Sequence, residues 1–176
     1  WTYNLSLQRI LDAEIEAGRA TPFIAVMPVQ NYQGRHDGEC VNAVNGTPVQ
    51  TTLTTQVRTA VLGQFRAQSA PESWAVMGFS TGGFCALDLA LRYPDLYRIG
   101  VSLAGTVSPY LDSTTGALFG NSVAARQADD PMWRVQHLAP PPVKVLLAVT
   151  RQDSSTEADA VRFARVARAP TRVQLL

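Results

Sequence analysis

Short apolar runs alternate with stretches of helical periodicity along this chain. Five mainly apolar runs predict buried strands, because a strand covered on both faces needs no polar alternation. They lie at 23–27, 74–77, 99–103, 143–149 and 171–176. Apolar residues three and four positions apart predict amphipathic helices, which lie at 7–15, 53–65, 82–92, 123–127 and 157–167.

This alternation predicts an α/β fold with a parallel sheet and helices on both of its faces. Such sheets bind their ligands at the carboxyl ends of the strands. The 176 residues suit a single domain spanning 1–176. Polar loops are expected at 31–50 and 104–130.

The composition excludes several classes of protein. Hydrophobic residues form 46% of the chain and charged residues 16%, whereas disorder requires low hydrophobicity and high charge. The net charge is +1 without blocks of like charge, so no nucleic-acid partner is expected. No apolar run has the length of a membrane span. No metal or cofactor is expected, since metal-ligand spacings and phosphate-binding glycine motifs are both missing from the sequence.

The candidate chemistry lies between the second predicted strand and the helix after it. Residues 78–82 read Gly-Phe-Ser-Thr-Gly, the G-x-S-x-G pattern of a nucleophile elbow. A sharp turn there exposes the oxygen of Ser80, and the glycines allow close backbone approach. The backbone N–H of Thr81 is placed to stabilise an oxyanion. An ordinary N-cap serine in a glycine-rich turn is the alternative interpretation.

A serine nucleophile also needs an acid and a base. Asp153 follows the strand predicted at 143–149, and we prefer it as the acid; a solvated loop aspartate is the alternative. Glu157 is the rival acid, but residues 154–157 match a capping box in which Glu157 caps its own helix.

Neither histidine occupies the position expected for the base. The expected chain order is serine, acid and then histidine, whereas His36 and His137 both precede Asp153. We therefore expect a surface or structural role for both.

The chain resembles the Putative esterase family of α/β-hydrolases, which includes esterase D-like enzymes and actinobacterial mycolyltransferases. The resemblance covers essentially the whole chain. Its matching segments are 23–28, 39–41, 53–57, 78–83, 91–97 and 146–149 leading to Asp153. It implies Ser80 as nucleophile, the Thr81 amide as an oxyanion donor and Asp153 as the acid.

The same resemblance implies that two parts of the family's domain are missing at the ends of this chain. Family members carry a first strand with a His-Gly loop upstream of the position of Trp1. They also carry a Gly-Gly-His segment after the position of Leu176, which supplies the catalytic base. We therefore expect 1–176 to be the central part of a larger hydrolase core, with little activity on its own.

The two cysteines, Cys40 and Cys85, are compatible with buried thiols or with one bridge. Secreted actinobacterial members of the family have cysteines at similar places, so the resemblance favours a Cys40–Cys85 disulfide. A disulfide in turn favours a secreted or envelope-associated protein over a cytoplasmic one.

These observations lead us to expect a serine hydrolase that acts on small-molecule or lipid carboxylic esters through an acyl-enzyme on Ser80. One alternative is an acyltransferase that passes the acyl group to a sugar hydroxyl, and another is a hydrolase-like binding domain without catalysis. Residues 104–142 are expected to form a cap that builds the acceptor cavity. Candidates for an acyl groove, or for a lid that only packs on the sheet, are Tyr110, Leu111, Leu118, Phe119, Met132 and Trp133.

Overall fold

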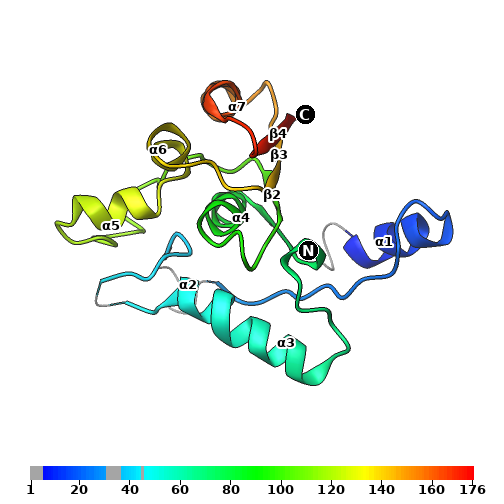
Figure 1. Ribbon diagram of the computed structural model, residues 1–176. Coiled ribbons are helices and arrows are strands. Elements are labelled where there is room, and N and C mark those ends of the chain that lie inside the picture. Colours follow the sequence, from blue (N-terminus) through cyan, green and yellow to red (C-terminus); the bar gives the residue numbers. More distant parts are fainter. Residues whose placement is uncertain (1–5, 31–36, 45) are drawn as a thin grey trace.

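Four parallel strands in sequence order form the sheet of this protein (Figure 1). The computed structural model describes residues 6–30, 37–44 and 46–176. The strands are β1 (Ala75–Phe79), β2 (Ile99–Leu103), β3 (Lys144–Ala148) and β4 (Arg172–Leu175). They confirm the α/β class and four of the five predicted strands.

Helices connect the strands as the periodicity predicts. The helices are α1 (Leu7–Glu16), α2 (Val49–Thr51), α3 (Arg58–Gln64), α4 (Thr81–Arg92), α5 (Val123–Ala128), α6 (Pro131–His137) and α7 (Ser154–Val166). A π-helical segment (η1, Thr52–Val57) joins α2 to α3, and a short 3₁₀ turn (η2, Pro71–Ser73) precedes β1. Helix α6 was not predicted, although its start carries a recognisable signal. Asp130 caps it by accepting the Trp133 N–H, and Pro131 occupies the first helical position.

The main core lies between one face of the sheet and helices α4, α6 and α7. Val145 and Leu147 of β3 point into it and meet Leu87 of α4 and Phe163 of α7. Helix α4 approaches β2 closely, because a Cβ on Gly100 would lie 2.9 Å from the Ala90 side chain. On the opposite face of the sheet, Met77 and Phe79 are 51% and 60% exposed.

The strand predicted at 23–27 is wrong. Residues 21–29 carry no strand assignment and pair with none of the described strands. Phe23 and Met27 are more than half exposed. The apolar run is real, but a strand also requires a neighbour that accepts its backbone hydrogen bonds, and the described residues supply none.

A buried polar network joins the helix that begins at α2 to α4. Gln50 is fully buried and donates from Nε2 to Asp88 and to Asp129, both at 2.9 Å. The Tyr93 hydroxyl donates to Oε1 of the same amide, and Arg92 forms an ion pair with Asp129. Burial raises the pKa of Asp88 to about 7, against the pull of the nearby arginines.

The expected Cys40–Cys85 disulfide is present. It ties the loop before α2 to helix α4, and the two Cα atoms lie 5.4 Å apart. Both residues belong to a second core cluster with Val49, Leu53 and Tyr97.

Replacing both cysteines with alanine is expected to lower the free energy of unfolding by about 4 kcal/mol. The bridge closes a separation of 45 residues, and its removal restores the corresponding chain entropy to the unfolded state. Denaturant titration measures the change. A reductant should shift the midpoint of the native protein but not that of the double variant, and equal midpoints without reductant would refute a stabilising bridge.

Candidate active site

Ser80 lies at the sharp turn between β1 and α4, as the motif predicts. Its backbone angles are φ 56° and ψ −122°, a left-handed conformation that is uncommon outside glycine. Three hydrogen bonds hold the turn: the Ser80 N–H donates to the Leu103 carbonyl at 2.9 Å, and the Gly83 and Phe84 N–H groups donate to the Ser80 carbonyl. Ser80 is exposed, so its hydroxyl is accessible at the carboxyl end of the sheet.

The two glycines of the motif are not equivalent. A Cβ on Gly78 would lie 2.1 Å from the backbone oxygen of Gly82, which no side-chain rearrangement can relieve. A Cβ on Gly82 would meet only the Gln30 side chain, at 3.7 Å. The elbow therefore requires glycine at position 78 for space and tolerates a methyl group at position 82.

We expect Gly78→Ala to lower the free energy of unfolding by roughly 3 kcal/mol or more, because the added methyl forces the turn apart. Gly82→Ala is the matched control, with an expected change within about 1 kcal/mol. Thermal and denaturant unfolding of both variants measure the difference. Equal destabilisation of the two would contradict this account of the elbow.

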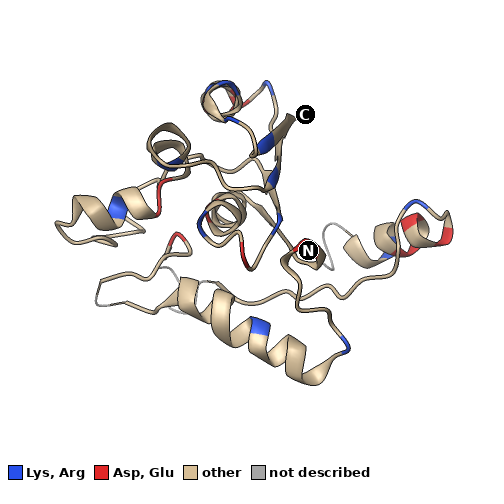
Figure 2. Ribbon diagram, viewed as in Figure 1, with Lys and Arg blue, Asp and Glu red and all other residues tan. Residues whose placement is uncertain are grey.

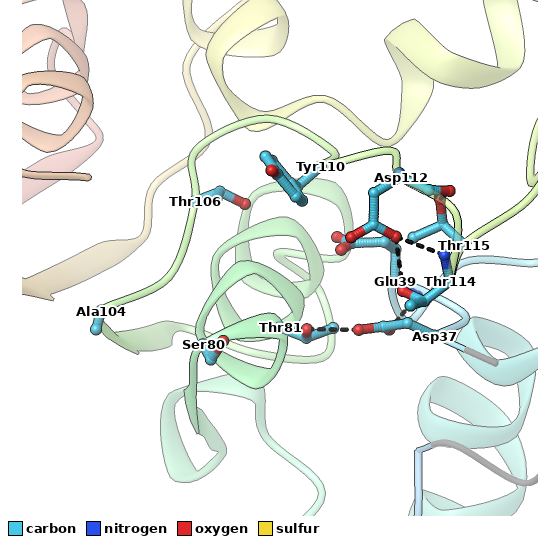
Figure 3. A pocket seen from close by; sticks show the side chains of 10 residues that line it. All are labelled: Asp37, Glu39, Ser80, Thr81, Ala104, Thr106, Tyr110, Asp112, Thr114 and Thr115. Carbon is cyan, nitrogen blue, oxygen red and sulfur yellow. Dashed lines mark hydrogen bonds between the residues drawn. The ribbon is translucent and has the colours of Figure 1, made fainter. Parts of the chain in front are cut away.

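A pocket of about 210 Å³ opens beside Ser80 (Figure 3). Its lining residues come from the loop at 37–39, from the elbow and from the loop after β2. They are Asp37, Glu39, Ser80, Thr81, Ala104, Thr106, Tyr110, Asp112, Thr114 and Thr115. Every one of them except Ala104 carries a hydroxyl or a carboxyl group, so the pocket is polar.

Thr81 contributes both to the elbow and to the wall of the pocket. Its hydroxyl donates to Asp37 Oδ2 at 2.8 Å (Figure 3). As the first residue of α4, it has a backbone N–H without an acceptor inside the helix. That N–H and the positive end of the helix dipole lie next to the serine, as an oxyanion donor requires.

Asp153 follows β3 but does not line this pocket. It is the N-cap of α7, where its carboxylate accepts from the Thr156 N–H at 3.2 Å and the Thr156 hydroxyl at 2.7 Å. The Thr156 hydroxyl, the Thr156 N–H and the Ser155 hydroxyl lower the pKa of Asp153.

The capping box predicted over 154–157 is wrong. The chain enters the helix one residue earlier, so Asp153 caps it and Ser154 is its first residue. Glu157 lies in the first turn and donates its N–H to the Asp153 carbonyl. The preferred acid is therefore also the residue that starts the helix.

His137, the histidine that the structure describes, does not line the pocket. His36 lies outside the described residues. His137 ends α6, stacks on Trp133 at 4.7 Å between ring centroids, and has Nδ1 2.8 Å from the Trp133 carbonyl. No histidine is among the described residues that line the pocket.

The loop after β2 contributes fewer groove residues than expected. Tyr110 lines the pocket, whereas Leu118, Phe119 and Met132 are at most 5% exposed and pack in the core. Sequence reasoning identified Thr81 but did not single out the other polar residues of the pocket, which include Asp37, Asp112, Thr106, Thr114 and Thr115. Their polar, loop-forming composition gave no signal that distinguished them from solvated positions.

The described part of the chain has neither a membrane-spanning helix nor a cluster of metal ligands. No helix there has the length and apolar character to cross a membrane. No group of three His, Cys, Asp or Glu side chains in residues 6–30, 37–44 and 46–176 is arranged to hold a metal ion.

The parallel sheet and the strand-to-helix elbow define a protein of the α/β-hydrolase type, and the comparisons agree. Residues 1–175 match the family described as Putative esterase, and the chain belongs to that family. This result confirms the resemblance drawn from the sequence.

Individual relatives are distant. An uncharacterized protein of Corynebacterium glutamicum is 29% identical over 121 residues, which are 57% of this chain and 28% of that protein. An S-formylglutathione hydrolase from Agrobacterium tumefaciens is 20% identical with a TM-score of 0.65, over 79% of this chain and 53% of that one. A ferulic acid esterase is 15% identical with a TM-score of 0.71, over 99% of this chain and 70% of that one. The chain thus spans about half of the first of these structures and less of the curated relative.

Proposed function

We propose that this protein is a serine esterase that forms an acyl-enzyme on Ser80. The observation that carries the proposal is the left-handed backbone of Ser80, which exposes its hydroxyl to a pocket at the carboxyl ends of the strands. A buried or ordinary N-cap serine does not need this strained conformation. Membership of the esterase family supports the same reaction class.

The proposed reaction has two steps. Ser80 Oγ attacks the ester carbonyl while its proton passes to a base, and the resulting oxyanion accepts a hydrogen bond from the Thr81 N–H. The C–O bond to the alcohol then breaks, and the alcohol leaves with the proton. Water repeats the attack on the acyl-enzyme, releases the acid and restores Ser80.

Two further groups are needed, and their assignment is part of the proposal. Asp153 is proposed as the acid that orients the base, because it follows β3 at the same edge of the sheet as Ser80. The base is proposed to be a histidine outside residues 1–176, in the part of its relatives' length that this chain does not span. Export to an oxidising compartment is proposed from the Cys40–Cys85 disulfide.

Acyl transfer to a hydroxyl acceptor is the second candidate function. It is favoured by the polar lining of the pocket, in which nine of the ten lining residues carry hydroxyl or carboxyl groups. Such a lining suits a hydroxylated acceptor better than it suits an apolar acyl chain. A binding domain without catalysis would result if Ser80 has no base.

A burst experiment tests the acyl-enzyme directly. The native protein is mixed rapidly with excess 4-nitrophenyl acetate, and nitrophenol release is followed. The proposal predicts a burst of one equivalent per active site, followed by slower turnover. Added glycerol that diverts the acyl group to glycerol ester would favour transfer, whereas no release above the buffer rate would reject both enzyme functions.

A further inference from the structure

One side of the Ser80 pocket is acidic. Asp37, Glu39 and Asp112 all line it. These three residues come from the loops at 37–41 and 104–115, and neither loop contains a Lys or Arg (Figure 2). Asp37 also accepts a hydrogen bond from the hydroxyl of Thr81, the residue that follows the proposed nucleophile. The acidic side of the pocket therefore lies next to Ser80.

Glu39 is buried without a full set of partners. Glu39 is 4% exposed, and its Oε2 has no hydrogen-bond partner among the described residues. The backbone N–H of Tyr110 donates to the carboxyl group. An unpaired buried carboxyl oxygen is costly, and a ligand that brings a donor into the pocket would remove that cost.

A strained and well-restrained backbone holds this carboxyl group in place. Glu39 and Cys40 both have left-handed backbones, with φ 44° and 60°, and neither is a glycine. The Cys40–Cys85 disulfide fixes the second of them to α4. The Glu39 N–H donates to Asp37 Oδ1 at 3.0 Å, and the Asp37 N–H donates to the Thr114 carbonyl at 3.0 Å. Two strained residues restrained in this way suggest a functional requirement rather than a loop defect.

Charge decides which kind of ligand suits these groups. The Thr114 hydroxyl and N–H lower the pKa of Asp112, so its carboxylate is ionised at neutral pH. A protonated amine offers three N–H donors and a positive charge, whereas a hydroxyl offers one donor and no charge. Resting on the esterase function proposed above, we propose that the pocket selects esters carrying a protonated amine, which Glu39, Asp37 and Asp112 bind beside Ser80.

This proposal predicts a dependence on pH. Burial, followed by Asp37 and Asp112, raises the pKa of Glu39 to about 8, so Glu39 is largely protonated at pH 7. A bound cation favours the carboxylate, lowers that pKa and releases the proton. Binding of a cation should therefore tighten as pH rises from 6 towards 9.

Binding without turnover tests the site separately from catalysis. Benzylammonium and benzyl alcohol are titrated into the native protein and followed by ligand NMR at pH 6, 7 and 8. We expect benzylammonium to bind about tenfold more tightly than benzyl alcohol at pH 8, with a smaller ratio at pH 6. Equal affinities, or a ratio that does not change with pH, would overturn the proposal.

Matched variants assign the effect to Glu39. Glu39→Gln keeps the size of the side chain and should remove most of the preference for the cation and its pH dependence. Asp159→Asn removes one exposed carboxylate on α7, outside the pocket, and should leave both unchanged. An equal loss in the two variants would mean that net charge alone attracts the cation, and it would overturn the assignment.

A kinetic comparison separates failure of this proposal from failure of the esterase function. The substrates are 4-(aminomethyl)phenyl acetate and its neutral analogue 4-ethylphenyl acetate, with 4-(aminomethyl)benzoate and 4-ethylbenzoate nitrophenyl esters as a second pair. A cationic-to-neutral ratio of kcat/KM that exceeds the ratio of the two esters' hydroxide hydrolysis rates, in either pair, supports the proposal. Hydrolysis of all four without a preference overturns it and leaves the esterase function intact, whereas no hydrolysis of any ester rejects the esterase function.

Discussion

Ser80→Ala is expected to reduce ester turnover by roughly five to six orders of magnitude, because it removes the atom that forms the acyl-enzyme. The remaining rate would come from binding and from the oxyanion donor alone. The change in KM should be small, since the hydroxyl makes its main contribution in the transition state. Purified variants are compared by kcat and KM on a nitrophenyl ester.

A matched serine distinguishes this effect from a general loss of hydroxyl groups. Ser73 ends η2 and is exposed, outside the pocket, so Ser73→Ala should keep the native kcat. The unfolding midpoint of Ser80→Ala should also stay close to native. A Ser80→Ala variant that keeps a tenth or more of the native kcat would exclude Ser80 as the nucleophile.

Asp153→Asn is expected to reduce kcat about 10⁴-fold if Asp153 orients the base. Asparagine is as good an N-cap as aspartate, so the cap of α7 should survive and the free energy of unfolding should change little. Asp153→Ala should show the same catalytic loss together with a destabilisation of about 1 kcal/mol, since it also removes the cap. Kinetics and denaturant unfolding on the same preparations separate the two roles.

The alternative acid provides the control. Glu157→Gln should retain native kcat, because Glu157 lies in the first turn of α7 and is not proposed to contact the base. Native activity in Asp153→Asn would show that Asp153 is only a helix cap. A large loss in Glu157→Gln alone would transfer the role of the acid to Glu157.

Periodicity predicted those parts of the fold that depend on local pattern and burial. The apolar runs at 99–103 and 143–149 became β2 and β3 because neighbours in the sheet pair with them and helices cover them. The run at 23–27 has the same pattern but no partner among the described strands, so pattern alone did not determine its structure. Helix α6 was missed, although Asp130 and Pro131 carry the signal of a helix start.

The candidate site was predictable only where one motif contains its chemistry. The spacing of Gly78, Ser80 and Gly82 predicts the elbow from the sequence alone. The acidic side of the pocket was not predictable, because Glu39 and Asp112 come from loops 73 residues apart in sequence and meet only after the sheet forms. The left-handed backbone of Glu39 is likewise invisible in a residue type that normally avoids it.

The most direct test of the central claim is the intact mass of the native protein before and after treatment with a fluorophosphonate. The account predicts one adduct per chain, mapped by peptide analysis to Ser80 and missing from Ser80→Ala. No adduct under conditions that label other serine hydrolases, or an adduct on a different residue, would contradict it.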